Sequence, residues 1–463
     1  MPRWTPADET ALPSQEEIGL ANQAINELTL ELERVTDAVD ASKLQNLDWG
    51  PYQQTREQTV ALMKEIQVLQ AWIAPIRKLP VEILSQIFVS VAQIAPLGPV
   101  RITEVCRLWH QAVISTPRAW VHIYLARKNI YKDPEQYFST FMKRSEPYLL
   151  HLFLPKEEYN DPEDPSQRPL EELIKAQSHR IRCLTIPNAE SQLQRPITTS
   201  FPHVDHLYVT IHYSCPFSIS AALFPSLRYL DCSGASWLTI SAKIEFPPLQ
   251  YLSFMLDSGS LWIAILQRCS TTLKGLKVIG RFLECEPAPK ARIVFPLLEH
   301  LEYSDYTDLD TGDELGEWPI EAITPRLISY ANYVDQIDGN SFPTMHTDVK
   351  YVTHLNTDDI SQLANYISLR FLQIIAFHTT FERVLTMLEE LGDDPKVLPA
   401  LEKIHVSQSS EEGPLELATT IVFMIEEKIL HLWPNVDLTI SDGLNPMPLG
   451  FEELEVCLCM SRF

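Results

Sequence analysis

The sequence has few of the residues that metal centres, disulfide frameworks and nucleotide-binding loops require. Its 463 residues include eight cysteines and 14 glycines. The cysteines are scattered, without paired zinc spacing and without the density of a disulfide scaffold. No phosphate-binding glycine loop, no Gly-x-Ser-x-Gly turn and no Cys/His pair in a recognisable context occurs. We therefore expect a protein that is not an enzyme and that holds no metal and no cofactor.

Positive charge and long apolar runs are also scarce. Lys and Arg number 37 against 61 Asp and Glu, and the formal net charge is −24. Such a charge repels phosphate backbones and anionic lipid, so we expect neither nucleic acid nor a membrane as a partner. No run of 18 apolar residues occurs, and the first residues lack the apolar stretch of a signal peptide. The expected location is the cytoplasm, the nucleus or both.

What is present is the composition of a folded protein with several parts. Hydrophobic residues make up 45% and charged residues 21% of the chain, and its length suggests roughly three domains. We expect a multi-domain α+β protein. Its predicted segments are a helical arm over 1–75, a three-helix unit over 76–125, a helical connection with an acidic loop over 126–175, and a repeat domain over 176–463.

The first segment has the pattern of a helical hairpin. Apolar residues recur every three or four positions over Ile18–Val39 and again over Leu62–Ile73. Ser14 and the acidic residues after it mark the start of the first helix, residues 48–51 break the pattern, and Pro75 ends the second helix. The hairpin can dimerise as a coiled coil or pack within one chain. Three heptads are few for a coiled coil, which favours packing within the chain.

A compact three-helix pattern follows. Pro80 suits the first turn of a helix, and apolar residues from Ile83 to Val91 then recur at helical spacing. A loop with two prolines over 96–99 precedes a second helical pattern over Ile102–Val113, and Pro117–Trp120 closes the unit. About forty-five residues cannot supply a self-sufficient core, so part of this apolar surface should be covered by another chain or domain.

These residues resemble the F-box, and the sequence around them is most similar to the large F-box families of mushroom-forming fungi. The positions that match the pattern are Leu79, Pro80, Glu82, Ile83, Leu84, Ile87, Phe88, Val105, Cys106, Arg107, Trp109, Pro117 and Trp120. The resemblance implies docking on a Skp-type adaptor, and through it on a cullin. The residues that it implies for this contact are Leu79, Pro80, Ile83, Leu84, Ile87, Phe88, Val105, Cys106, Trp109 and Trp120. For Trp109, and to a similar degree Trp120, packing between the F-box helices is a natural alternative.

One departure from that pattern concerns the connection between the first two helices. The F-box usually carries a leucine-rich step there, whereas residues 93–100 lengthen the loop and add two prolines. This difference favours weaker adaptor binding.

The C-terminal half contains an internal repeat. Four units begin with Phe-Pro and carry an aliphatic residue three positions after the phenylalanine. The first aliphatic of each predicted unit is Ile181, Val204, Leu227, Leu249, Leu273, Leu298, Leu327, Val349, Leu369 or Leu401, and a weaker unit spans Trp433–Val436. Spacings of 20 to 32 residues, with apolar residues at alternate positions of a short strand, resemble leucine-rich repeats. The asparagine or cysteine expected in each turn is mostly missing, so we expect an irregular α/β solenoid.

The candidate for substrate binding is an acidic insertion over Ser304–Trp318, which could hold a basic partner. Its candidate residues are Asp305, Asp308, Asp310, Asp313, Glu314 and Trp318. Its resemblance to a calcium loop fails because the glycine comes one residue early and flanking helices are missing. His203 and His206 fall on opposite faces of an expected strand, so they are interpreted as surface histidines rather than as metal ligands. Cys457 and Cys459 are interpreted as a buried pair.

The sequence therefore predicts a substrate-recognition adaptor of a Skp–cullin–F-box ubiquitin ligase, whose repeats hold an unknown substrate protein. The alternative is an interaction scaffold that acts outside any ligase. A hydrolase or transferase hidden in the repeats is a third reading, which would need a cluster of perturbed carboxylates or a nucleophile beside a base.

Overall fold

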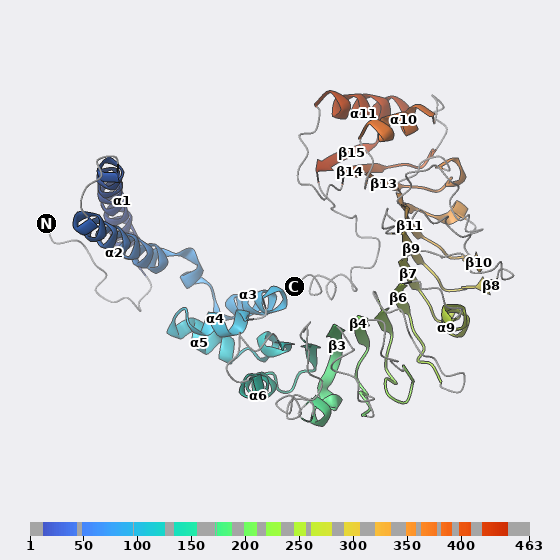
Figure 1. Ribbon diagram of the computed structural model, residues 1–463, viewed down its shortest axis with the longest axis horizontal. Coiled ribbons are helices and arrows are strands. Elements are labelled where there is room, and N and C mark those ends of the chain that lie inside the picture. Colours follow the sequence, from blue (N-terminus) through green and yellow to red (C-terminus); the bar gives the residue numbers. More distant parts are fainter. Residues whose placement is uncertain are drawn as a thin grey trace. The chain divides into compact units, whose positions relative to one another are not determined.

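The computed structural model of the chain contains an N-terminal helical region and a parallel β-sheet (Figure 1). It describes residues 13–43, 49–95, 97–125, 134–154, 172, 174–187, 199–210, 219–232, 245–255, 261–279, 291–305, 320–334, 349–357, 363–376, 381–390, 398–408 and 419–442. The chain divides into two compact units. One comprises Met1–Phe88 with Ile102–Val113, and the other comprises Val89–Arg101 with Ile114–Phe463.

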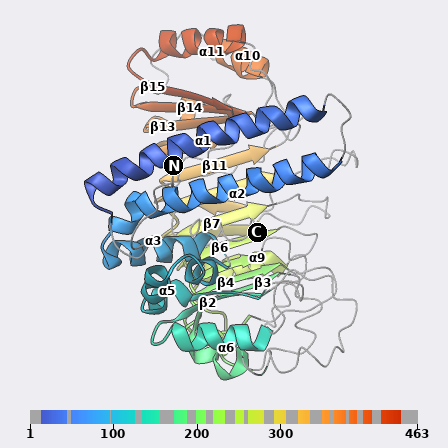
Figure 2. The same cartoon turned by 90° about the vertical axis from the view of Figure 1, so that its left-hand side faces the viewer.

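The N-terminal helices form a hairpin whose two long members run side by side (Figure 2). These are α1 (Gln15–Lys43) and α2 (Trp49–Ile73). Their shared core contains Ala24, Leu28, Leu62, Ile66 and Leu69. The predicted apolar stripes thus pack on each other within one chain, because residues three and four apart lie on one face of a helix.

Both ends of the hairpin follow from local chemistry. At the start of α1, the Ser14 N–H donates to Glu17 Oε2 at 2.9 Å, and the Glu17 N–H donates to Ser14 Oγ at 3.3 Å. This reciprocal pair is a capping box. The predicted break over residues 48–51 is placed too far along the chain, because α2 already begins at Trp49 and accepts Pro51 in its first turn, where a missing N–H leaves no bond unmade. Its end at Ile73, ahead of Pro75, is confirmed.

Five short helical segments follow the hairpin. They are η1 (Pro75–Lys78), α3 (Val81–Ile94), α4 (Gly98–Thr103), α5 (Arg107–Ile114) and η2 (Pro117–Trp120). The continuous helical pattern predicted over Ile102–Val113 is interrupted, because a turn at residues 104–106 separates α4 from α5. Gly98 begins α4 so close to α3 that a Cβ would lie 3.1 Å from the Val91 carbonyl oxygen. The glycine therefore permits a tight connection at the place where the sequence predicts a loop.

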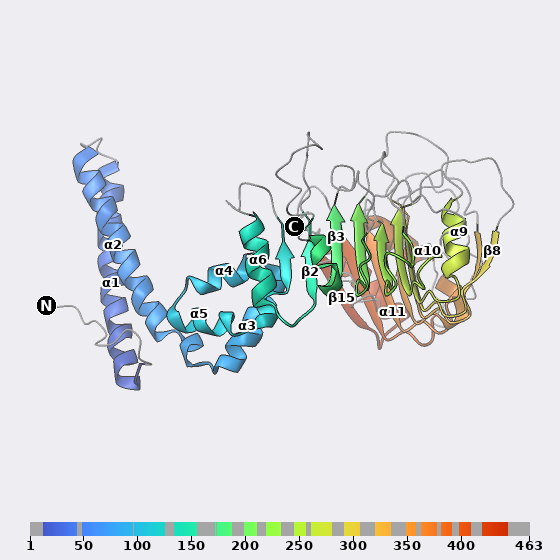
Figure 3. The same cartoon turned by 90° about the horizontal axis from the view of Figure 1, so that it is seen from below.

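The sheet has 13 parallel strands, and its hydrogen-bonded order is β1-β2-β3-β4-β5-β6-β7-β9-β11-β12-β13-β14-β15. Its first seven strands are β1 (His122–Tyr124), β2 (Leu150–Phe153), β3 (Ile181–Pro187), β4 (His206–Thr210), β5 (Tyr229–Cys232), β6 (Tyr251–Met255) and β7 (Gly275–Ile279). The others are β9 (His300–Asp305), β11 (Ser329–Val334), β12 (His354–Thr357), β13 (Phe371–Ala376), β14 (Lys403–Gln408) and β15 (Asp437–Asp442). Figure 3 shows β2 and β3 pointing the same way. The strands β8 (Ala291–Val294) and β10 (Ile320–Ile323) form a separate parallel pair.

One face of the sheet is an apolar ladder. Strand pairing brings the following side chains into one row, and each of them is at most 8% exposed: Leu152, Leu184, Leu207, Leu230, Leu252, Leu276, Leu301, Tyr330, Leu355, Leu372 and Ile404. Burying each leucine contributes about 1.5–3 kcal/mol relative to leaving it exposed. Because side chains alternate between faces along a strand, the residues next to the ladder in sequence point to the other face of the sheet.

The first aliphatic residue predicted for each repeat, Val349 excepted, lies three residues before the ladder residue of the same repeat, and most of these residues are confirmed as core positions. Ile181, Val204 and Leu227, for example, are fully buried. The assignment of Val349 is wrong. Val352 is fully buried three residues before the ladder residue of β12, whereas Val349 is partly exposed in η5 (Val349–Tyr351).

Backbone bonds between successive turns take the place of the missing asparagine or cysteine side chains. The Leu227 N–H donates to the Phe224 carbonyl at 3.2 Å, and the N–H groups of Arg228 and Tyr229 donate to the Asp205 carbonyl of the preceding unit at 3.0 and 2.9 Å. Phe224 itself is buried. The Phe-Pro motif therefore supplies a core side chain and a carbonyl for the turn, which satisfies the backbone groups that a buried turn must pair.

Helices lie along the outer face of the sheet, as Figure 1 shows for α6, α9, α10 and α11. Their bounds, with those of the remaining short helices, are α6 (Pro134–Arg144), η4 (Ser178–Arg180), α9 (Leu261–Cys269), η6 (Leu363–Asn365), α10 (Phe381–Glu390) and α11 (Thr419–Leu432). Within the described residues, none of the helices combines the length and the apolar content needed to span a bilayer.

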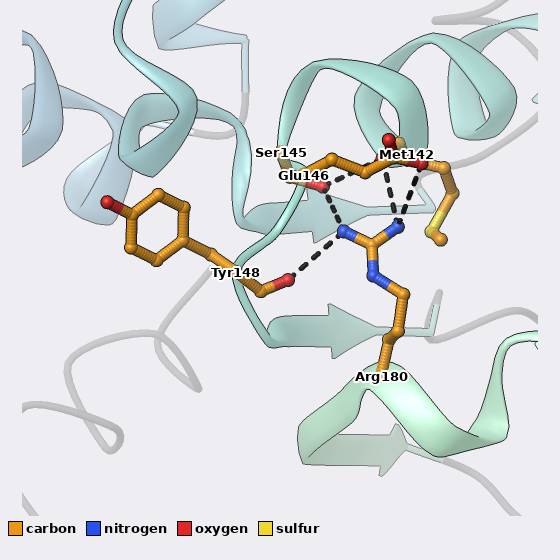
Figure 4. A network of polar contacts seen from close by, with 5 residues as sticks. All are labelled: Met142, Ser145, Glu146, Tyr148 and Arg180. Atoms are coloured by element: carbon orange, nitrogen blue, oxygen red, sulfur yellow. Dashed lines mark hydrogen bonds and ion pairs between the residues drawn. The ribbon is translucent and has the colours of Figure 1, made fainter.

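An arginine holds the end of α6 to the sheet (Figure 4). The Arg180 guanidinium donates to the Met142 carbonyl at 3.0 Å, to Ser145 Oγ at 3.1 Å and to the Tyr148 carbonyl at 3.1 Å, and it lies 4.0 Å from the Glu146 carboxylate. The last carbonyls of a helix have no partner inside it and carry its negative dipole end. A cation at this position satisfies both needs.

Candidate functional site

The residues predicted to contact an adaptor divide into buried and exposed sets. Leu84 and Phe88 are 0% and 1% exposed, and the Phe88 ring lies 5.2 Å from the Trp109 ring. Trp120 is 0% exposed, packs edge-on against Phe141 at 4.9 Å and lies under the Arg144 guanidinium. In the free chain, Leu84, Phe88 and Trp120 therefore have a packing role.

The other predicted contacts remain accessible. Pro80, Ile83, Val105 and Cys106 are exposed, and Leu79, Ile87 and Trp109 are partly exposed. Ile83 and Val105 expose 42% and 58% of their surface. These apolar side chains lie on α3 and on the turn between α4 and α5.

Two further exposed apolar residues were missed by the sequence reasoning. Val81 on α3 and Leu108 on α5 are 44% and 45% exposed. Helical spacing carries no signal for Val81, because three residues before Leu84 it shares the face on which α3 buries Leu84, Phe88 and Ala92, and it is exposed as the first residue of the helix. We call Val81, Ile83, Val105 and Leu108 the apolar surface of the three-helix unit.

The sheet carries a second row of side chains on the face opposite the leucine ladder. We call it the ring row, because most of its members have rings. In pairing order it comprises His122, His151, Cys183, His206, Tyr229, Tyr251, Gly275, His300, Ser329, His354, Phe371, Lys403 and Asp437. Because neighbouring strands are about 4.8 Å apart, rings on successive strands can stack.

The stacking is close and nearly parallel in the centre of the row. The His206 and Tyr229 ring centroids are 4.0 Å apart and those of Tyr229 and Tyr251 are 4.6 Å apart, each with an interplanar angle of 5°. Further along, His354 stacks on Phe371 at 4.5 Å and 16°. The interpretation of His206 as a surface histidine is wrong, because its side chain is 12% exposed. His203 is exposed as expected, but it lies on a turn and not on the expected strand.

A polar cluster lies at the start of β4. The His206 Nδ1 lies 2.6 Å from Asp205 Oδ1, and Arg182 Nε donates to Asp205 Oδ2 at 2.9 Å. Burial raises the pKa of Asp205, but the hydrogen bonds from His206 and Arg182 outweigh it and lower the pKa below its usual value. Cys183 pairs in register with His206, yet its thiol is fully buried, which gives this Cys, His and Asp set no access to a substrate.

The first two histidines of the row, the buried His122 and the partly exposed His151, are uncharged at neutral pH. Burial, and then the charge of His151, lower the pKa of His122 to about 3. Burial, and then the charges of Arg182 and His206, lower the pKa of His151 to about 4 against the opposing effect of Asp205. Their rings are 4.6 Å apart. Across the described part of the chain, no three His, Cys, Asp or Glu side chains are grouped to hold a metal ion.

The predicted substrate-binding insertion is barely covered by the described residues. Asp305 ends β9. The remaining candidates, Asp308, Asp310, Asp313, Glu314 and Trp318, lie outside the described residues, as do Cys457 and Cys459. No family model matches the chain, and no match was found among the curated proteins.

Proposed function

We propose that this protein is the substrate-recognition adaptor of a Skp–cullin–F-box ubiquitin ligase. The F-box resemblance of Leu79–Trp120 supports the adaptor contact. The long sheet, with its leucine-rich-repeat-like units, supports a separate surface for a substrate protein. Such an adaptor acts in the cytoplasm, the nucleus or both, and it has no catalytic side chain of its own. Its contribution is positional, because holding a substrate beside the conjugating enzyme raises the effective concentration of the target lysine.

The observation that carries the proposal is the apolar surface of the three-helix unit. Its four side chains, Val81, Ile83, Val105 and Leu108, are 42% to 58% exposed. About half of each side chain is still exposed, and burying that half in an interface would contribute about 1 kcal/mol to the binding free energy. Four exposed aliphatic side chains within one short helical segment cost free energy in water, and an interface explains them better than a solvated face does.

A scaffold function outside any ligase is the alternative, and a specific observation favours it. Leu84, Phe88 and Trp120 belong to the residues implied for adaptor binding, yet they are buried in the free chain. In this alternative the three-helix unit is only a structural part of the chain, and the sheet alone binds a partner.

A pulldown with a purified Skp-type adaptor separates the two functions. The test variant carries Ile83→Ala, Val105→Ala and Leu108→Ala, and the control carries Val60→Ala and Met63→Ala, which are exposed apolar residues of α2. We expect the wild type and the control to bind and the triple variant to lose binding, with circular dichroism unchanged in all three. A folded wild type that does not bind the adaptor would replace the ligase proposal with the scaffold.

A further inference from the structure

The last strand of the parallel sheet has one edge that no other described strand covers. β15 pairs with β14 on one side, and it ends the hydrogen-bonded order of the sheet (Figure 1). A strand at the end of a sheet presents a row of N–H and C=O groups that the sheet itself does not pair, which makes it a template for a further strand. The backbone of β15 can therefore accept another extended segment.

The register shows which backbone groups point to this edge. The Asp437 N–H donates to the Glu402 carbonyl, next to β14, at 2.9 Å, so it points back into the sheet. Successive residues of a strand direct their N–H and C=O groups to opposite sides. The N–H and C=O groups of Leu438 and Ile440 therefore point outward, away from β14.

The apolar ladder is less covered at this end than inside the sheet. Leu438 and Ile440 pair in register with Ile404 and Val406 of β14. The two side chains of β14 are 0% exposed, whereas the two side chains of β15 are partly exposed. The opposite end differs, because all three residues of its last strand, β1, are buried. Alternate apolar side chains of an added strand would extend the ladder beyond β15 and cover it.

The charge at this edge favours a basic segment. The Asp437 carboxylate is 72% exposed and lies 3.8 Å from Lys403 Nζ of β14. A cation on a strand beyond β15 would give Asp437 a second partner of opposite charge, as cross-strand pairs prefer. A second copy of this chain is disfavoured, because it would bring another Asp437 and a net charge of −24 to the same edge.

We propose that the outer edge of β15 binds an extended segment of a partner protein by strand addition, and that this segment alternates apolar with basic residues. Its apolar side chains cover Leu438 and Ile440, and a lysine or arginine lies beside Asp437. Main-chain hydrogen bonds give such a contact its affinity, and the alternate side chains give it specificity. The identification of the partner as a ubiquitination substrate rests on the proposed ligase function, but the binding edge does not.

The experiment uses the full chain and a labelled peptide of alternating lysine and valine. Its binding is measured by fluorescence anisotropy at physiological ionic strength, where nonspecific attraction between distant charges is screened. A peptide with glutamate in place of lysine should bind at least about tenfold more weakly. Asp437→Asn should weaken the lysine peptide about twofold to fivefold. Glu426→Gln is the matched control, because it removes an exposed carboxylate of α11, and it should leave binding unchanged.

A second pair of variants tests the backbone contact. Ile440→Pro removes an outward N–H, and Ile440→Ala removes most of the same side chain but keeps that N–H. Proline is tolerated on an edge strand where the N–H faces away from the sheet. The proline variant should bind the lysine peptide about threefold to tenfold more weakly than the alanine variant, the effect of one hydrogen bond. Circular dichroism checks folding, and Asp437→Asn keeps the test decisive if the proline variant does not fold.

Three results would overturn the proposal. One is a folded wild type that binds neither peptide, as expected if residues 443–463 or a second copy of the chain occupy the edge. Another is equal binding of the lysine and glutamate peptides. The third is binding of the lysine peptide that neither Asp437→Asn nor a folded Ile440→Pro weakens relative to its control, which would show nonspecific attraction to an acidic chain. The adaptor pulldown does not use this edge, so it separates failure of this site from failure of the ligase proposal.

Discussion

Lowering the pH should destabilise the sheet through the two histidines at its start. His122 and His151 have an ordinary pKa of 6.5, which the fold lowers to about 3 and about 4. Above pH 6.5 both states of the protein hold neutral imidazoles, so these groups add no pH dependence. As the pH falls below 6.5, His122 and His151 bind protons in the unfolded chain but stay neutral in the folded chain, so the free energy of unfolding decreases. The loss stops for each histidine once the pH passes its folded pKa.

The magnitude follows from the size of the two shifts. Each unit of pKa difference corresponds to about 1.4 kcal/mol, which gives a total loss of roughly 5 kcal/mol for His122 by pH 3 and roughly 3 kcal/mol for His151 by pH 4. Between pH 6 and pH 5 the two together should remove about 2.4 kcal/mol. Domains of this kind have a total stability of about 5–15 kcal/mol, so this loss would dominate acid unfolding.

Urea denaturation at a series of pH values from 7.5 to 5 measures this slope. His122→Gln and His151→Gln remove one titrating group each and keep a polar side chain of similar size. Each should reduce the number of protons taken up on unfolding by about one. His203→Gln is the control, because His203 lies exposed on a turn. A slope that stays the same in both His122→Gln and His151→Gln would refute the account of the histidine pair.

Three further predictions concern packing and ion pairs. Arg180→Met should lower the free energy of unfolding by about 2–4 kcal/mol in urea, because several acceptors at the end of α6 lose a charged donor, and Arg180→Lys should restore little of it. A lysine variant as stable as the wild type would contradict the need for a planar fork. Trp120→Ala should cost about 3–5 kcal/mol in the same assay, since the fully buried ring packs on its neighbours, and a loss below 1 kcal/mol would show that the site collapses. Glu402→Gln breaks the bidentate pair with Arg370 at the sheet surface, yet Tm should not change measurably because both groups are exposed, and a clear drop in Tm would contradict this.

The repeat units were predictable where the sequence carries its Phe-Pro signature. Phe224 and Leu227 are fully buried, as a strand start with alternating apolar residues requires. The unit of β12 lacks that signature, and Val349 and Val352 are both apolar at acceptable spacings. Only packing against the neighbouring strand decides between them, and it selects Val352.

The first strands and the helix break could not be predicted from local patterns. β1 and β2 are three and four residues long and lie in segments assigned to the three-helix unit and to a connection. Their strand conformation depends on pairing with a partner far along the chain. Helical periodicity likewise continues through residues 104–106, where the structure has a turn.

For the candidate site, the sequence predicted a segment but not which side of each helix is exposed. Leu84 and Ile83 are adjacent and equally apolar, yet one is buried and the other exposed. Which of them faces inward depends on how helices of different segments pack.

The strand order has a consequence for how this sheet comes apart. Each strand of the 13-stranded sheet pairs with the nearest strands of that sheet before and after it along the chain, and none of these described strands pairs with a more distant one. Cooperativity in such an array passes from neighbour to neighbour. A lesion in the middle of the array therefore splits one melting transition into two, with the strands on each side unfolding as separate blocks. A lesion in the last strand shortens the array and leaves the rest to melt together.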